Sequence, residues 1–297
     1  MIEYLPRCVA FTLLLASHCP AAPKNHLPVT AISHMVIQVS DVERSVRWYR
    51  DLFGLSVVGK STLLQFGDEP RFVRISSALD TNTGISEIGF SGAGFKTNRA
   101  VGVLNQRGAS SVKHFPEAVL FEDPAGIKVQ VGRFNGIDPE PAKCLLPIRD
   151  FNHFTIFVPD AKRNVQFYQQ LFGLRIDTYQ GPMPLIRVGD GNQFLAFVGG
   201  RSEAFIHHAC FSIENFDPDR VFKRLSEYGL KPRTKKRGPV GPLEYYVVMR
   251  MPNRGGAEKG TPELYLTDPD GILLQLQDVK YAGGGGYLGE KRGTENP

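Results

Sequence analysis

Two histidines, His34 and His153, occupy equivalent places in a segment that the chain contains twice. Residues 33–55 recur at 152–174 with a constant offset of 119, from the histidine through an apolar, β-branched run to the sequence Leu-Phe-Gly-Leu. This spacing indicates a duplicated unit in which a strand leads into an amphipathic helix. Because neutral imidazole is a common metal ligand, the repeat places a potential ligand at the same point of each half.

Further correspondences extend the duplication toward the end of each half. The Phe-Ser pair at 90–91 reappears 121 positions later at 211–212. The Asp-Pro-x-Gly sequence at 123–126 matches 268–271, now with an offset of 145. The larger offset locates an insertion between residues 229 and 268.

The elements that must position these residues follow from periodicity and capping signals. An apolar run predicts a strand at 32–39, and Ser40 to Glu43 form a capping box that starts a helix ending near Gly54. The same order of one strand, one helix and further strands is expected four times. The prediction is an α+β protein of four βαβββ modules. The predicted segments are an N-terminal extension (1–30), a first domain (31–135), a linker (136–149), a second domain (150–280) and a Gly-rich tail (281–297).

Together these motifs resemble the vicinal oxygen chelate superfamily, which includes glyoxalase I, bleomycin-resistance proteins and extradiol ring-cleaving dioxygenases. The resemblance covers about residues 31–278 and rests on the strand histidine, the helix that ends in Phe-Gly-Leu, and the Asp-Pro-x-Gly turns. It implies that the modules pair into two domains, each with a strongly curved, cup-like mixed sheet. Four modules in one chain are similar to the extradiol dioxygenases, whereas glyoxalases and resistance proteins commonly have two.

The resemblance also implies a site in the second half. His153, His208 and Gln275 stand where extradiol dioxygenases place His, His and Glu around non-haem iron, and Tyr265 stands where they carry an active-site tyrosine. Strand alternation independently places these side chains on the concave face, with His207 toward the helices. The implied cofactor is a divalent metal ion, Fe(II) by resemblance, with Mn, Zn or Ni as alternatives.

Two departures from the family pattern bear on the reaction. Gln275 replaces a carboxylate, and a neutral amide oxygen is a poorer donor to a hard divalent ion. The acid–base histidine expected shortly before the second ligand is absent, since residues 192–194 read Asn-Gln-Phe. In the first half, His34, Glu87 and Gln130 occupy the equivalent positions and formally make a second set of three ligands. In four-module relatives this half is usually a metal-free scaffold.

Three functions remain open at this point. The first is a metal-dependent oxygenase that acts on a small phenolic or keto substrate chelated through vicinal oxygens, with Tyr265 donating a hydrogen bond to the bound oxygen or to the developing anion. The second is a glyoxalase-like lyase or isomerase, in which the metal would stabilise an enediolate. The third is a resistance-type protein that binds a small molecule without chemistry.

Composition narrows the class of partner. The 297 residues carry a formal net charge of +5, and no basic amphipathic helix or aromatic-basic interleaving indicates nucleic acid. The expected partner is a small-molecule substrate, with a homodimer as a further possibility. Basic residues cluster at 231–237, either as a solvated hairpin or as a lid that attracts anions.

The two ends of the chain need separate interpretation. Arg7, the apolar stretch 9–16 and the Pro-rich stretch 19–23 have the outline of a short secretory signal, which favours a secreted or periplasmic protein over a cytoplasmic one. The alternative is an irregular extension, and the stretch is too short to span a membrane. The glycine run 283–286 lacks a strand-to-helix context and predicts a flexible tail.

Overall fold

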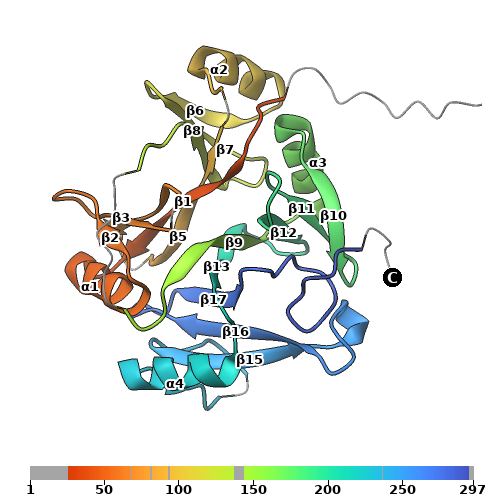
Figure 1. Cartoon of the computed structure of the whole chain (residues 1–297). Helices are drawn as coiled ribbons and strands as arrows, with labels where there is room; N and C mark the ends of the chain where they lie inside the picture. Colours follow the sequence, from red (N-terminus) through yellow and green to blue (C-terminus); the bar gives the residue numbers. More distant parts are fainter. Residues whose placement is uncertain are drawn as a thin grey trace, which may run out of the picture.

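The computed structural model describes residues 26–67, 69–80, 82–92, 94–136, 144–235 and 237–293. The candidate secretory signal lies outside these residues, and so does half of the predicted linker (137–143). Along the described chain, runs of strands are separated by single helices (Figure 1), so the predicted α+β class is confirmed. No helix in these ranges is long and apolar enough to cross a membrane.

We call residues 26–136 the first half and residues 144–293 the second half. The first half contains β1 (Ala31–Val39), α1 (Val42–Phe53), β2 (Ser56–Val57), β3 (Leu63–Phe66), β4 (Arg71–Ser77), β5 (Gly84–Ser91), α2 (Thr97–Gln106), β6 (Ser110–His114), β7 (Ala118–Glu122) and β8 (Lys128–Gly132). The second half contains β9 (Ile148–Phe157), α3 (Ala161–Phe172), β10 (Arg175–Gln180), β11 (Met183–Arg187), β12 (Phe194–Val198), β13 (Phe205–Ile213), α4 (Pro218–Tyr228), β14 (Lys231–Pro232), β15 (Glu244–Arg250), the 3-10 helix η1 (Pro252–Arg254), β16 (Thr261–Thr267) and β17 (Leu273–Asp278).

An N-cap hydrogen bond and a left-handed glycine set the two ends of helix α1. The carboxylate of Asp41 accepts a hydrogen bond from the backbone N–H of Arg44 at 2.9 Å, and Gly54 closes the helix at φ 77°. The predicted capping box is therefore wrong by one residue. Asp41 is the N-cap, and Ser40 donates its hydroxyl to Asp270 of the second half instead.

The strand pairing places the two halves in the same register. In each half the first strand of the repeat lies between two partners, β1 between β4 and β5, and β9 between β12 and β13. Across the first-half sheet the paired residues are Phe72, His34, Gly89 and Gln130. Across the second-half sheet they are Phe194, His153, Cys210 and Gln275. Residues matched by the sequence offsets thus occupy equivalent positions in the sheets.

The inserted residues lie in two loops on either side of β15. Residues 233–243 connect β14 to β15, and residues 251–260, which include η1, connect β15 to β16. In the first half the connection that precedes β6, the counterpart of β15, comprises only residues 107–109, and the hairpin from β6 to β7 only residues 115–117. Both extra loops therefore belong to the end of the second-half sheet that carries β15.

Each half contributes a helix to the other half, so that one hydrophobic core spans both. On α1 the hydroxyl of Tyr49 donates to Asp268 of the second half at 3.3 Å. On α3 the equivalent Tyr168 donates to Asp123 of the first half at 3.1 Å. The two Asp-Pro-x-Gly turns thus fasten the two halves reciprocally.

The C-terminal segment differs from the expected flexible tail. Residues 281–284 are buried, and Tyr281 packs with Leu185 of β11 and Phe194 of β12. Gly283 has φ 80°, and a Cβ there would lie 2.3 Å from the side chain of Leu185. Close packing therefore favours glycine at 283, and also at 284, where a Cβ would collide with the backbone carbonyl of Lys291.

Candidate functional site

A row of side chains crosses one face of the second-half sheet, because directly paired residues on neighbouring strands point to the same side. Within β13, His208 shares this face with Cys210 by alternation. We call it the site face. In order across β15, β16, β17, β13, β9 and β12, the paired residues are Tyr246, Tyr265, Gln275, Cys210, His153 and Phe194. The structure thus brings His153, His208, Gln275 and Tyr265 together on one surface.

The ring of His153 is held in a defined orientation and tautomer. Its Nδ1 lies 2.8 Å from Oδ1 of Asn152, and Nδ2 of Asn152 donates to the carbonyl of Tyr281 at 2.8 Å. Because the second bond assigns the amide orientation of Asn152, Nδ1 of His153 must be the donor to Oδ1. The lone pair of His153 therefore lies on Nε2. The ring also stacks on Phe194, with centroids 4.4 Å apart.

His208 lies beside this ring with its outer nitrogen unused. The two imidazole centroids are 5.5 Å apart, and Nδ1 of His208 contacts Nδ1 of His207 at 2.7 Å. Among the described residues, neither Nε2 of His208 nor Nε2 of Gln275 has a hydrogen-bond partner, although both atoms are buried. Because unpaired buried polar groups are costly, these two nitrogen atoms are available to a ligand.

His207 does not lie where alternation predicted. Pairing between β13 and β9 shifts register between Ile206 and His208, which indicates a β-bulge. The bulge turns the imidazole of His207 away from the helices. It instead stacks on Phe157 with centroids 4.5 Å apart and contacts His208.

The electrostatics of the site keep both imidazoles neutral. Burial lowers the pKa of His153 to about 3, and the nearby cations Arg250 and Arg187 act in the same direction while Gln275 opposes them. Burial also lowers the pKa of His208 well below its usual value, with His153 and His207 adding to the effect. Neutral imidazole is the form that ligates a metal ion.

Tyr265 is a proton donor that does not ionise. Burial, and then the charge of Glu263, raises the pKa of its phenol well above the ordinary value. Its hydroxyl lies 3.4 Å from Oε2 of Glu263, and its ring meets the ring of His208 edge-on at 5.3 Å. Tyr265 is thus held protonated at the border of the site.

The sequence did not predict the buried ion pair that Arg250 and Glu263 form next to Tyr265. Nε of Arg250 donates to Oε1 of Glu263 at 2.9 Å, and the side chain of Arg250 is fully buried. Arg250 also donates to the carbonyl of Gly284 at 2.9 Å, so the ion pair anchors the C-terminal segment. Alternation placed Glu263 on the face of Tyr265, but no signal identified Arg250, which is a single cation in a strand.

In the first half, both ring nitrogens of His34 already have partners within the protein. Nε2 of His34 lies 3.4 Å from Oε1 of Glu87, and Nδ1 lies 2.9 Å from the hydroxyl of Ser33. The ring sits directly on Gly89, where a Cβ would lie 1.9 Å from it. Gln130 lines a cavity of about 180 Å³ next to His34. Among described residues no cluster of three or more His, Cys, Asp or Glu could hold a metal, so each set of three depends on its glutamine.

A cavity of about 450 Å³ opens beside the site face. It is lined by Tyr246 and Thr267 of the site face, by His207, and by residues 83–85 of the first half. Leu273, two residues before Gln275 on β17, also lines it. The cavity is therefore large enough for a small organic molecule. Its lining residues His207 and Tyr246 contact His208 and Tyr265, which do not line it themselves.

A family model described as the Glyoxalase/Bleomycin resistance protein/Dioxygenase superfamily matches residues 31–131 and 150–276. The chain belongs to this superfamily. The two matched segments correspond to the two halves of the duplication, and the second contains all four residues that the sequence singled out as a site. A search of curated proteins gave no significant match.

Solved structures of related fold include both dioxygenases and a glyoxalase. A mutant of homoprotocatechuate 2,3-dioxygenase from Brevibacterium fuscum matches with a TM-score of 0.62 and 17% identity, over 87% of this chain and 74% of that one. The Mn(II)-bound glyoxalase from Novosphingobium aromaticivorans matches with a TM-score of 0.63 and 18% identity, over 84% and 82%. The 2,3-dioxygenase LapB from Pseudomonas sp. KL28 matches with a TM-score of 0.60 and 17% identity, over 84% and 92%. At these identities the likeness establishes the fold.

Proposed function

We propose that this protein is a metal-dependent oxygenase resembling extradiol ring-cleavage dioxygenases, and that it acts on a small phenolic or keto substrate bound through vicinal oxygens. The observation that supports this most directly is the pair of nitrogen atoms of His208 and Gln275 that have no partner among the described residues, beside His153, whose lone pair lies on Nε2. Two neutral imidazoles and a carboxamide that can turn its oxygen inward suit a divalent ion.

His153, His208 and Gln275 would hold the ion, with Fe(II) favoured by resemblance and Mn, Zn or Ni as alternatives. When bound, a divalent ion supplies a Lewis acid that polarises the two oxygens of the substrate. The ligand set lacks the usual carboxylate. Glu263 is buried on the site face, but its charge is paired with Arg250, so the site carries less negative charge than a two-His-one-carboxylate set.

The remaining groups have roles that follow from their contacts. Tyr265, which keeps its proton, would donate a hydrogen bond to the bound oxygen or to an anion that develops there. Asn152 would hold Nε2 of His153 ready for ligation by accepting the Nδ1 proton. The C-terminal segment around Tyr281 would exclude water from the end of the site next to Phe194.

Two alternative functions are supported by the lack of an acid–base histidine at residues 192–194. Where a proton-carrying histidine is expected, Gln193 bonds Asp150 and the backbone of Ile32, and Phe194 stacks on His153. These side chains have structural contacts and transfer no proton. A glyoxalase-like lyase or isomerase, or a resistance-type protein that binds without chemistry, therefore stands as the competing function.

Metal content and oxygen uptake distinguish the three candidate functions. Protein purified without chelator should contain about one divalent ion per chain by elemental analysis, and the variant His153→Ala should lose it. His34→Ala, the same change in the first half, is the matched control and should retain it. Oxygen consumption with a panel of catechols then supports the oxygenase, whereas metal without oxygen uptake would favour the lyase. Wild-type protein that takes up no metal would leave only the binding protein.

The finer architecture and the cellular setting are part of the same proposal. We propose that the four βαβββ repeats pair into two domains with the boundaries given above and that each sheet curves into a cup. A homodimer and a secreted or periplasmic location stay predictions, to be checked by sedimentation and by N-terminal sequencing of the natural protein.

A further inference from the structure

The cavity beside the site face is a composite of the two halves and of the insertion. Residues 83–85 of the first half form one wall, and the inserted residues Arg233 and 238–240 form another. The equivalent connection of the first half, between α2 and β6, comprises only residues 107–109 and is too short to provide such a wall. A molecule bound in this cavity would therefore contact inserted residues that have no counterpart in the first half.

Arg233 is connected to the proposed metal ligands by a ladder of rings. Its guanidinium carbon lies 5.0 Å from the centroid of the Tyr246 ring. Tyr246 stacks on Tyr265 with centroids 5.2 Å apart and an interplanar angle of 18°. Tyr265 in turn meets the edge of His208. Stacking on Tyr246 fixes the plane of the guanidinium and leaves little freedom to lose on binding.

The charge of Arg233 is not neutralised by any described residue. Its Nη2 donates to the carbonyl of Gly238 at 2.6 Å, while its Nε is buried and has no partner among the described residues. Asp270, a carboxylate that also lines the cavity, is already paired with Arg44 at 2.8 Å and with the hydroxyl of Ser40. The cavity is therefore lined by one stacked cation whose charge no described carboxylate neutralises.

We infer that the substrate carries an anionic substituent, a carboxylate on a phenolic or keto compound, and that Arg233 recognises it. This inference rests on the proposed function, because the reacting oxygens would lie at His153, His208 and Gln275 while the substituent lies in the cavity. A planar guanidinium binds carboxylate through paired N–H donors, and the charge of Arg233 has no carboxylate partner among the described residues. The basic insertion is thus a specificity element rather than only a solvated hairpin.

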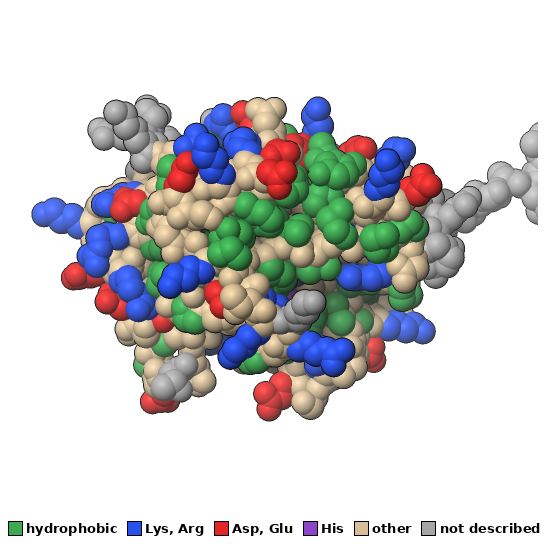
Figure 2. Space-filling model, turned by 90° about the horizontal axis from the view of Figure 1, so that it is seen from below, with side chains coloured by type: hydrophobic (Ala, Val, Ile, Leu, Met, Phe, Trp, Pro, Cys, Tyr) green, Lys and Arg blue, Asp and Glu red, His purple; other side chains and the backbone are tan. Residues whose placement is uncertain are grey.

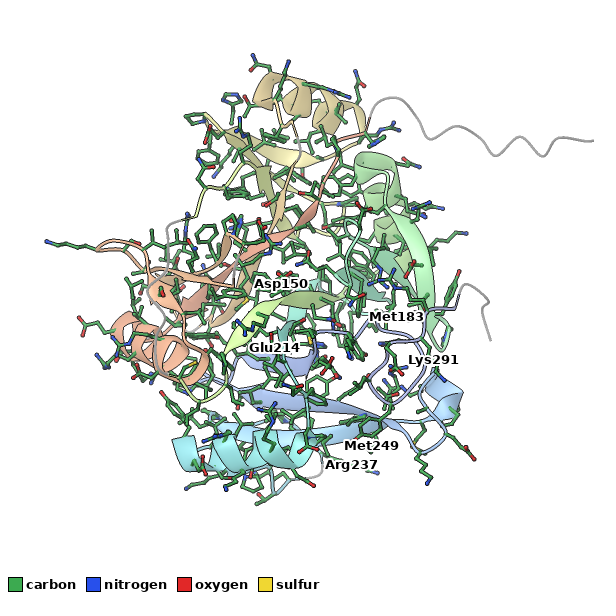
Figure 3. All side chains as sticks on the ribbon, in the orientation of Figure 1. Asp150, Met183, Glu214, Arg237, Met249 and Lys291 are labelled. Carbon is green, nitrogen blue, oxygen red and sulfur yellow. The ribbon has the colours of Figure 1, made fainter. Side chains whose placement is uncertain are left out.

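The test compares two probes of nearly equal shape, 3,4-dihydroxybenzoate and 3,4-dihydroxybenzamide, which differ in charge. Their dissociation constants are measured by calorimetry for wild type, Arg233→Gln and Arg237→Gln, each with and without Mn²⁺. Arg237 lies in the same loop but is exposed, does not line the cavity, and sits at the outer edge of the molecule in Figure 3. Thermal unfolding checks that both variants fold.

We expect wild type to bind the benzoate at least about 10-fold more tightly than the benzamide, and Arg233→Gln to abolish this preference by weakening the benzoate about 10- to 100-fold, as for hydrogen bonds to charged groups. Arg237→Gln should keep the preference. Equal binding of the two probes by wild type, a preference that survives in Arg233→Gln, or no binding of either probe overturns the inference. If Mn²⁺ tightens the binding of neither probe, the metal proposal fails. The ratio of the two dissociation constants then still tests the role of Arg233.

Discussion

At the position where a carboxylate would complete the ligand set, the second half carries the neutral side chain of Gln275. It is buried to 1% exposure between two imidazoles that are themselves neutral. Its Nε2 has no hydrogen-bond partner among the described residues. Gln277 on the same strand donates its amide to the carbonyl of Pro262, while its Oε1 likewise has no partner among the described residues. Gln275 differs from Gln277 in lying beside His153 and His208, where its side chain acts on the pKa of both imidazoles.

Placing a carboxylate at position 275 is the most direct test of the proposed metal ligands. Gln275→Glu adds a negative charge with little change in volume, so it should tighten binding of Mn²⁺ or Fe²⁺, whereas His208→Ala should weaken it about 10-fold or more. Competition with a chelator measures both affinities, and Gln130→Glu in the first half is the control. If Gln275→Glu only destabilises the protein and His208→Ala leaves metal content unchanged, these side chains merely line a polar pocket.

The tautomer of His153 gives a second prediction, with a control that the duplication supplies. Asn152→Ala removes the acceptor for Nδ1–H and should weaken metal binding about 10- to 100-fold, as losses of such supporting hydrogen bonds do. Ser33 is the equivalent residue, since it contacts Nδ1 of His34. Ser33→Ala should leave metal affinity unchanged. Equal affinities of Asn152→Ala and wild type would show that the orientation of His153 does not depend on Asn152.

At the scale of elements, the C-terminal segment is a structural part of the site. Tyr281 accepts from Asn152 through its carbonyl, the carbonyl of Ala282 accepts from Arg187 at 2.9 Å, and that of Gly284 accepts from Arg250. Two buried arginines and the residue that orients His153 therefore all depend on a segment without helix or strand. Backbone carbonyls can serve these donors only where the chain approaches closely, which explains the glycines.

Substitution in the glycine run should therefore be costly. Gly283→Ala places a methyl group 2.3 Å from Leu185 at a backbone φ of 80°, and we expect a loss of about 1–3 kcal/mol in the free energy of unfolding. Gly293→Ala, where nothing lies within 4 Å, is the control and should cost almost nothing. Urea denaturation measures both. Equal stability of the two variants would contradict the packing described for this segment.

At the scale of the molecule, the two halves hold each other by reciprocal hydrogen bonds. Asp123 receives the hydroxyl of Tyr168 and, at 2.8 Å, the amide of Asn164, whereas Asp268 receives only Tyr49 from the partner helix. Burial raises the pKa of Asp268 to about 6, because its hydrogen bonds offset only part of the desolvation. The surface around this shared core carries interspersed basic and acidic side chains on the face shown in Figure 2, without a single basic field.

The Asp268 contact predicts a pH-dependent effect. A folded-state pKa near 6, above the unfolded value of 3.8, means that stability from this group is complete below the unfolded value and is lost as pH rises through 6. Tyr49→Phe removes a bond to the ionised carboxylate, so it should cost about 1.5–3 kcal/mol at pH 8 and about 1 kcal/mol at pH 5. Chemical denaturation at both pH values measures the cost, with the half-exposed Tyr287→Phe as control. A cost independent of pH would refute the assignment.

The amino-acid sequence by itself determined the repeat, the order of elements and the side chains that share a face, because these follow from local periodicity. The equivalence of His34 with His153 and of Gln130 with Gln275 could be read from offsets alone, and strand alternation grouped His208 with Cys210. The bulge that redirects His207 left no mark in the sequence, since it depends on how β13 pairs with β9.

Only the tertiary structure decided the contacts between residues far apart in the chain. Arg250 meeting Gly284, Tyr49 meeting Asp268, and Arg233 standing above Tyr246 all depend on how loops and helices of different repeats come together. Composition predicted a flexible tail at 283–286 because glycine permits flexibility, yet glycine also permits close packing, and the neighbours Leu185 and Phe194 decide between the two. Local pattern identifies the faces of strands, whereas burial, charge pairing and unsatisfied atoms arise only once those faces meet.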